Sequence, residues 1–103
     1  MDIERVKQTL ETATQEDIQF DTHFYKRSMM RPVNEGMVRR FILDTKRLEQ
    51  VERGKQGKSR HKLWFKMSSK YSLVIIVEIK TPKGLKVISA WNTHRKWQNK
   101  LKR

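Results

Sequence analysis

The chain has 103 residues with 24 Lys or Arg against 11 Asp or Glu, which gives a formal net charge of +13. This length holds one domain and excludes a second hydrophobic core. The lack of cysteine excludes a disulfide scaffold, and the longest apolar run, between Tyr71 and Ile79, is too short to cross a bilayer. Because no segment has the pattern of a signal peptide, the sequence predicts a cytoplasmic protein with no membrane partner.

The charge is distributed unevenly along the chain. Residues 1–20 carry two bases and five acids, whereas residues 21–103 carry 22 bases and six acids. A compact domain with a field of one sign attracts polyanions and captures them faster. The charge therefore favours a nucleic acid as the partner, and the alternative is a surface whose charge serves only solubility.

Helical spacing of apolar residues predicts a first helix within the acidic segment 1–16. Its apolar positions are Ile3, Val6, Leu10 and Ala13. This helix can pack on the domain in the ordinary way, cover part of the basic surface, or dock on a partner. The next three residues, 18–20, alternate in polarity as a short strand does.

Two further helices follow this strand. Asp21 and Thr22 can cap a helix that runs to about Met30, and Pro32 ends it because the residue before a proline avoids the helical region. Asn34 is the N-cap of the third helix, across which Val33 can contact Val38. The expected buried stripe of this helix consists of Met37, Val38, Phe41, Ile42 and Leu48. Its outward positions are Arg39, Arg40, Lys46 and Arg47.

The rest of the chain has the pattern of strands. A basic loop at residues 54–58 leads to a strand over 62–67, and Thr81–Gly84 fits a tight turn between strands at 71–80 and 85–91. The segment 71–80 is apolar on both faces, as a central strand would be. The sequence thus predicts an α+β fold in which N-terminal helices pack on one face of a three- to four-stranded, mainly antiparallel sheet. The other face would stay open and form the working surface.

Basic residues adjoin aromatic ones in the predicted sheet. Trp64 alternates with Leu63 and Phe65, so it faces outward if those two face the core. Cations can hold phosphate while an exposed ring stacks a base, and the alternative is that Trp64 packs within the fold. The predicted nucleic-acid contacts are Arg39, Arg40, Lys58, Arg60, His61, Lys62, Trp64, Trp91, Arg95 and Lys96.

Candidate catalytic groups lie at both ends of the basic region. His23, Arg27 and Arg31 are spaced four residues apart and share one helix face, and the alternative is a solvated face with an incidental histidine. Histidine exchanges protons near neutral pH, so His94 is a candidate general acid or base.

The sequence predicts no metal site and no cofactor. The histidines are scattered, cysteine is absent, and the basic 83 residues contain no paired carboxylates. A nuclease of this composition would act without metal and would use the 2′-hydroxyl of RNA as the nucleophile, which favours RNA over DNA.

With these residues in view, the chain resembles the RelE/ParE-like toxin superfamily, and most closely a family of uncharacterised RelE-like domains. The resemblance covers residues 18–97. It does not include the acidic helix of 1–16 or the basic tail of 98–103. The matching segments are FDTHFYKRSMMR at 20–31, the helix that begins at Asn34, the strand of 71–79 and VISAW at 87–91.

The resemblance implies a RelE-like α+β fold, cleavage of mRNA as the activity of some relatives, and a small antitoxin protein as partner. His23, Arg27 and Arg31 match the helix signature of the family, and Ser89 matches the small residue of its last strand. Relatives often carry a catalytic tyrosine or a basic cluster near the C-terminus, where this chain has His94, Arg95 and Lys96 but no tyrosine. Three functions stay open: a metal-independent endoribonuclease, a non-catalytic nucleic-acid-binding module, and a module that binds an antitoxin-like protein.

Overall fold

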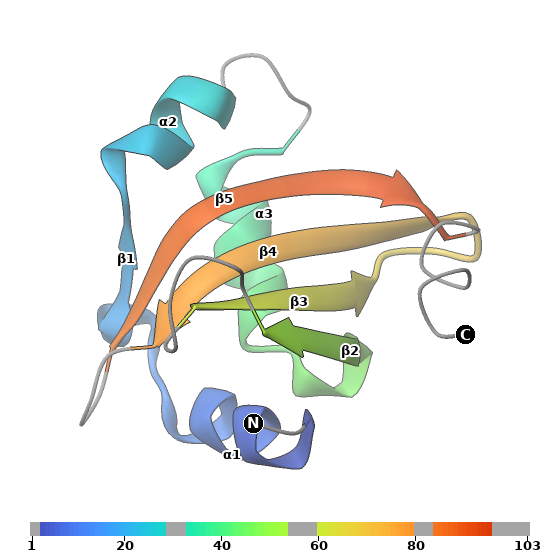
Figure 1. The fold of residues 1–103 in the computed structure, drawn as a ribbon, viewed down its shortest axis with the longest axis horizontal. Coiled ribbons are helices and arrows are strands. Elements are labelled where there is room, and N and C mark those ends of the chain that lie inside the picture. The colour runs from blue at the N-terminus through green and yellow to red at the C-terminus, as the bar shows by residue number, and fades with distance from the viewer. Residues whose placement is uncertain (1–2, 29–32, 54–59, 80–83, 96–103) are drawn as a thin grey trace.

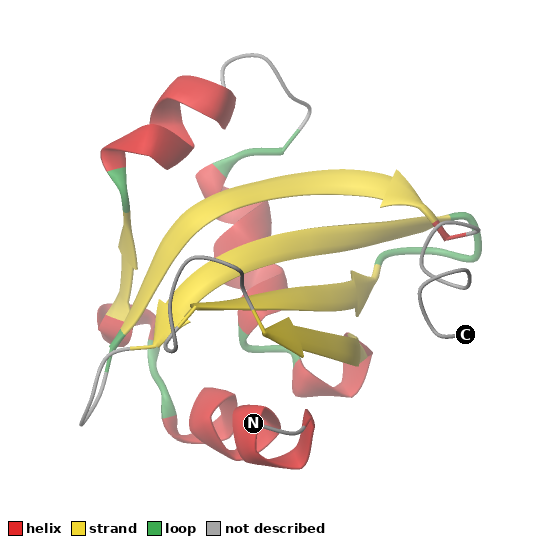
Figure 2. Ribbon diagram, viewed as in Figure 1, coloured by secondary structure: helices red, strands yellow, loops and turns green. Residues whose placement is uncertain are grey.

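The computed structural model describes residues 3–28, 33–53, 60–79 and 84–95. The described helices are α1 (Ile3–Thr12), α2 (Thr22–Ser28) and α3 (Glu35–Ile42), with 3-10 turns η1 (Gln15–Asp17) and η2 (Thr45–Arg47). The strands are β1 (Ile18–Phe20), β2 (Leu48–Arg53), β3 (Arg60–Lys66), β4 (Tyr71–Ile79) and β5 (Leu85–His94). The chain is therefore an α+β protein whose helices precede most of the sheet (Figures 1 and 2).

The five strands form one mixed sheet in the order β1-β5-β4-β3-β2. The strands β2 to β5 pair antiparallel as a meander, and the short β1 pairs parallel with the start of β5. The predicted count of three to four strands is too low, because Leu48 was assigned to the third helix and residues 49–53 to no strand. The predicted central position of β4 is confirmed.

The third helix is shorter than the predicted stripe, because α3 ends at Ile42 and Leu48 already begins β2. In β2 the register shifts between Leu48 and Gln50, so the strand has a bulge at Glu49. A bulge adds one residue to the strand and places Leu48 and Val51 on the same face although they are three residues apart. Leu48 follows Phe41 by seven residues, a spacing that also fits one face of a helix, which explains the error.

The predicted helix caps are confirmed. The Asn34 side chain accepts a hydrogen bond from the Met37 N–H at 2.9 Å, and the Asp21 side chain accepts one from the His23 N–H at 2.8 Å. Each cap satisfies a backbone donor that the first helical turn leaves without a partner in the helix. Val33 and Val38, which flank the Asn34 cap, are both buried in the core.

The helices cover one face of the sheet. Leu73, Ile75 and Val77 of β4 point to that face and are fully buried. They belong to one hydrophobic cluster with Val6 of α1 and Ile42 of α3. Figure 1 shows α3 crossing behind the strands, so this face forms the main core of the domain. Among the described residues, no helix is long and apolar enough to span a membrane.

The second face of the sheet is not open, contrary to the sequence-based expectation. Trp64 of β3, Val74 of β4 and Trp91 of β5 occupy one row across the strands. Trp64 is 3% exposed and Val74 is fully buried. The Lys62 Nζ lies 5.2 Å from the ring centroid of Trp64 and 5.4 Å from that of Trp91, so its side chain covers part of this row.

The two faces of β4 predict different costs for the same substitution. Ile75→Ala should lower the free energy of unfolding by about 2–5 kcal/mol, because it leaves a cavity beneath the helices. Ile76→Ala should cost clearly less, since Ile76 is only half-buried and lies on the second face. Urea denaturation followed by tryptophan fluorescence measures both costs.

If the Ile75→Ala chain does not fold, Ile75→Val and Ile76→Val allow the same comparison. Ile75→Val should lower the free energy of unfolding by about 0.5–1.5 kcal/mol. An equal cost at the two positions would contradict the assignment of the faces.

Candidate nucleic-acid interface

The histidine-led stripe of the second helix is only partly described. His23 is exposed in the first turn of α2, and Arg27 lies in the last turn of that helix. Arg31 lies outside the described residues, so the alignment of the three groups stays a prediction.

The structure does not bring His23 and His94 together. The Asp21 N–H donates a hydrogen bond to the Val87 carbonyl at 2.9 Å, which fixes the start of α2 beside the first part of β5. The partners of Val87 and His94 on β4 are Val77 and Tyr71, six residues apart, or roughly 20 Å at about 3.3 Å per residue. Figure 1 shows α2 and the end of β5 at opposite ends of the sheet. The two histidines therefore do not share a site.

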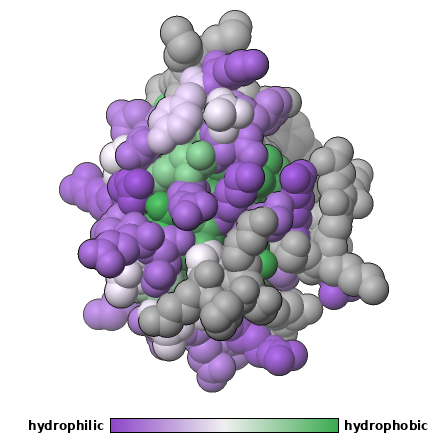
Figure 3. Space-filling model, turned by 90° about the vertical axis from the view of Figure 1, so that its left-hand side faces the viewer, coloured by the Kyte–Doolittle hydropathy of each residue, from purple (hydrophilic) through white to green (hydrophobic). Residues whose placement is uncertain are grey.

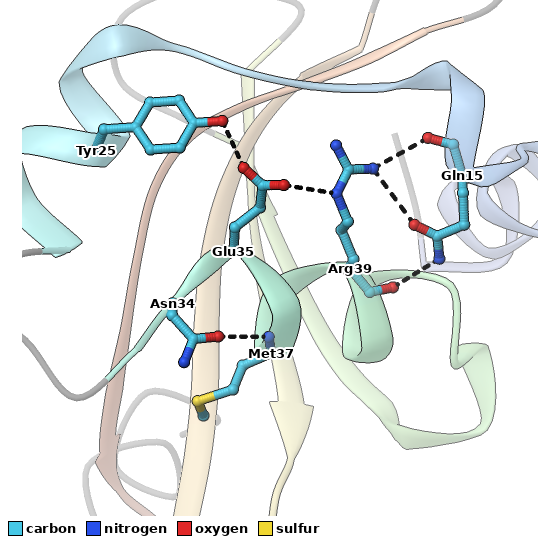
Figure 4. Close-up of polar contacts among 6 residues, drawn as sticks. All are labelled: Gln15, Tyr25, Asn34, Glu35, Met37 and Arg39. Atoms are coloured by element: carbon cyan, nitrogen blue, oxygen red, sulfur yellow. Dashed lines mark hydrogen bonds and ion pairs between the residues drawn. The ribbon is translucent and has the colours of Figure 1, made fainter.

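Arg39 takes part in a brace between α2, α3 and η1 (Figure 4). Its Nε donates to Glu35 at 3.1 Å, and its Nη1 donates to the backbone carbonyl of Gln15 at 3.2 Å. The Tyr25 hydroxyl donates to the other oxygen of Glu35 at 2.5 Å. The guanidinium carbon also lies 5.0 Å from the Phe20 ring centroid. Arg39 thus holds the fold together instead of facing a ligand.

The brace lies at the end of the molecule where β1 and α2 meet. Figure 3 shows this side, on which a small apolar area lies among hydrophilic side chains. Half-buried Phe20 on β1 belongs to this region. In contrast to Arg39, Arg40 on the next position of α3 is exposed.

Two carboxylates near this end have lowered pKa values. The hydrogen bond from the Tyr25 phenol, and then that from Arg39, lowers the pKa of Glu35, while the same phenol bond raises the pKa of Tyr25. The hydrogen bond from the His23 N–H, helped by Lys86 at 3.4 Å, lowers the pKa of Asp21. Both carboxylates are therefore held in the charged form by the fold.

His61 does not lie on a binding surface. Its side chain is 2% exposed, because it has the same parity on β3 as Leu63 and Phe65 and so points to the helix-covered face. Arg60 has the opposite parity, but its Nε lies 3.5 Å from a carboxylate oxygen of Glu78. The prediction that His61 contacts nucleic acid is therefore corrected by its burial.

Trp64 lies on the second face, as its parity predicted, but it is not available for stacking. Its Nε1–H donates to Glu52 at 2.6 Å, and Lys62 lies over its ring. Trp91 is half-buried on the other side of the same lysine. The alternative interpretation, in which Trp64 packs within the fold, is the one that the contacts support.

Arg95 is also used by the fold. Its guanidinium makes two hydrogen bonds to the Glu49 carboxylate, at 2.6 and 3.2 Å, and its side chain is 18% exposed. A third contact reaches the Ser72 hydroxyl at 3.4 Å. Two other predicted contacts, Lys58 and Lys96, lie outside the described residues.

Several exposed residues lie together where β3 ends and β4 begins, while other exposed bases, such as Lys26 on α2 and Arg40 on α3, lie elsewhere. We call this region the β3–β4 end and define it by Lys46, Arg47, Lys66, Lys70, Tyr71 and His94. Arg47 connects η2 to it, since its Nη1 donates to the Lys66 carbonyl at 3.1 Å. The Arg95 N–H donates to the Lys70 carbonyl at 2.8 Å and connects the end of β5. Figure 1 shows these strand ends side by side at one end of the sheet.

Tyr71 is the functional candidate that the sequence analysis missed. It is 46% exposed and pairs across the strands with His94. The two ring centroids are 5.5 Å apart at an interplanar angle of 64°, which is an edge-to-face contact. The strand β4 thus places a tyrosine beside His94.

The β3–β4 end combines cations, an exposed aromatic ring and an exposed imidazole. Such a set can hold phosphate, contact a base and move a proton. Within the described segments, no three His, Asp or Glu side chains are grouped so that they could hold a metal ion.

The brace predicts a pH-dependent contribution to stability. A carboxyl whose pKa is lower in the folded state stabilises the fold above its unfolded pKa, about 4.3 for glutamate, and this contribution is lost as the pH falls through the folded value. Glu35→Gln should therefore be less stable than the wild type at pH 7, and the difference should narrow as the pH falls from about 6 to 3.

Chemical denaturation across this pH range, with Tyr25→Phe and the double variant, gives the coupling between the two side chains. The coupling should be favourable at neutral pH and vanish in acid. A coupling that does not change with pH would show that the Glu35 charge does not hold the brace.

Comparison with known proteins adds no relative to this picture. No protein-family model, curated protein or solved structure matches the chain. The contacts and charges described above are therefore the basis for assigning a function.

Proposed function

We propose that this protein binds nucleic acid at the β3–β4 end, with RNA as the target. The observation that carries the proposal is the excess of positive charge there. Lys46 and Lys66 are exposed, as is Lys70, and none of the three forms an ion pair with another described residue. An exposed group of ammonium ions gains most from the displacement of counterions along a polyphosphate.

The acids near this end do not cancel that charge. Asp44 forms an ion pair with Arg47 at 3.1 Å, and Glu49 forms one with Arg95 at 2.6 Å. These two carboxylates are each balanced by an arginine, while exposed Glu11, whose carboxylate lies 3.5 Å from the Thr45 hydroxyl, offsets one of the three lysine charges.

RNA is favoured over DNA by the chemistry available. His94 contacts Tyr71, and exposed Lys70 precedes that tyrosine in the chain, so a proton-transfer group and a cation lie at one end of the sheet. In cleavage, His94 would take the proton of a 2′-hydroxyl, whose oxygen attacks the adjacent phosphorus while the bond to the 5′ oxygen breaks. The Tyr71 hydroxyl can return a proton to that oxygen, and the products are a 2′,3′-cyclic phosphate and a 5′-hydroxyl end. DNA lacks the nucleophile.

The resemblance to RelE/ParE-like toxins supports the same proposal. A short first strand, two helices and an antiparallel meander follow one another between residues 18 and 94 in the order that the resemblance implies. A RelE-like endoribonuclease with an antitoxin-like partner is the specific form of the proposal. The alternative is a module that binds nucleic acid without cleaving it, and the separation of His23 from His94 favours this alternative by removing one proton-transfer group.

Binding should depend on the lysines of the β3–β4 end. Lys66→Ala with Lys70→Ala should weaken the retention of single-stranded RNA and reduce the salt slope by roughly 1.4, at about 0.7 per lost phosphate contact. The matched control is Lys7→Ala with Lys26→Ala, which removes the same charge from α1 and α2. Filter retention across a salt series measures the slopes, and equal effects of the two pairs would argue against a site at this end.

Cleavage, where it occurs, should persist in EDTA and depend on one histidine. His94→Ala should slow it by about 10²–10⁴-fold at saturating protein, where any loss of RNA affinity does not enter the rate, because general acid–base catalysis contributes that much. His23→Ala, at the other end of the sheet, should have no effect. Gel analysis of labelled RNA, with a 2′-deoxy strand as the resistant control, measures the rates. Unchanged cleavage in His94→Ala would remove this histidine from the mechanism, and a wild type that retains RNA intact would identify the non-catalytic module.

A further inference from the structure

Tyr71 differs from the other exposed tyrosine of the described residues. Tyr25 is 47% exposed, but its ring lies 5.6 Å from that of Phe24 and its hydroxyl is bonded to Glu35. Tyr71 is 46% exposed, and its ring contact is with His94 at the rim of the sheet. Part of the apolar Tyr71 ring is therefore exposed to water, where a ligand could cover it.

The backbone around Tyr71 is held in place on both sides. The N–H groups of Met67 and Ser68 donate to the Tyr71 carbonyl at 3.1 and 3.2 Å. The Ser68 hydroxyl accepts hydrogen bonds from the N–H groups of Lys70 and Tyr71, both at 3.2 Å. The ring therefore extends from a fixed turn, so little conformational entropy is lost when a ligand contacts it.

His94 supports the ring without stacking on it. At an interplanar angle of 64° the imidazole and the phenol meet edge to face, so the two rings do not lie flat against each other. Lys70 precedes the tyrosine in the chain, and Lys66 pairs with Ser72, the residue that follows it. Because Lys66 and Ser72 face the second side of the sheet, Lys70 is the exposed cation next to a base laid on the tyrosine.

We propose that Tyr71, supported by His94, is a stacking platform for one unpaired base, so that the protein selects single-stranded RNA over duplex RNA. This inference rests on the proposed function and names its substrate class. In a duplex both faces of a base are covered by its neighbours, whereas a single strand can place a base on a protein ring. The lysines alone would bind both forms through their phosphates.

The test compares a single strand with a hairpin duplex of the same length and charge, both 2′-O-methylated so that no cleavage occurs. Tyr71→Leu keeps an apolar strand residue but removes the aromatic face, and it should weaken single-strand binding roughly 5- to 150-fold. Tyr71→Phe retains the aromatic face and should bind within about threefold of the wild type. Duplex binding should change little in either variant.

A 2-aminopurine base in the single strand gives a second measurement that does not depend on affinity. Its fluorescence should be quenched by the wild type and Tyr71→Phe but not by saturating Tyr71→Leu. Circular dichroism and the denaturation midpoint establish that each variant is folded.

Equal losses of single-strand and duplex affinity, or quenching that survives in Tyr71→Leu, would overturn the platform while leaving the lysine site intact. A wild type that retains neither RNA at low salt would overturn the proposed function itself. The two failures are therefore distinguishable.

Discussion

The burial of β4 on both faces is the constraint on which the rest of the structure depends. Leu73 and Ile75 are covered by the helices, but Val74 between them is equally buried on the opposite side. A strand that is apolar on both faces needs a neighbour on each edge and a cover on each face. Here β3 and β5 occupy the edges, and the second face contains Trp64, Trp91 and the Lys62 side chain between them. The face that could have been a flat binding surface is thereby used for packing.

This constraint divides the positive charge into two groups. Arg39 and Arg95 neutralise half-buried carboxylates, and Lys62 lies over two indole rings, so these cations stabilise the fold. The lysines at the β3–β4 end form no ion pair with another described residue. A net charge of +13 therefore overstates the charge available to a ligand, and exposed bases such as Lys26 and Arg40 share the remainder with the β3–β4 end.

Local signals determined which elements sequence analysis could predict. The caps at Asp21 and Asn34, the short β1 and the strongly apolar β4 each carry their signal within a few residues, and all were found. The failures involve spacing and parity. Leu48 lies seven residues after Phe41, a spacing that fits one helix face, so the start of β2 was assigned to the third helix. His61 was assigned to the surface because it is basic, although its alternation with Leu63 already placed it inside.

The pairing of Tyr71 with His94 shows why the site itself was harder to predict than the fold. Ile79 pairs with Leu85, so a regular hairpin counted back from that pair would place Tyr71 opposite Thr93. The register shift between Ile76 and Val77 moves the partner by one residue to His94. Because successive residues of a strand point to opposite faces, that single step decides whether an imidazole or a hydroxyl meets the ring.

The arginines that face no ligand still affect the site. Glu49 lies near the end of β5 and would attract the lysine ammonium groups if its charge were not met by Arg95. The same holds for Asp44 and Arg47, whose guanidinium also contacts the Lys66 carbonyl. By binding the carboxylates in short ion pairs, the arginines leave the lysines free to interact with phosphate. The stability of the sheet end and the affinity of the proposed interface therefore depend on the same ion pairs.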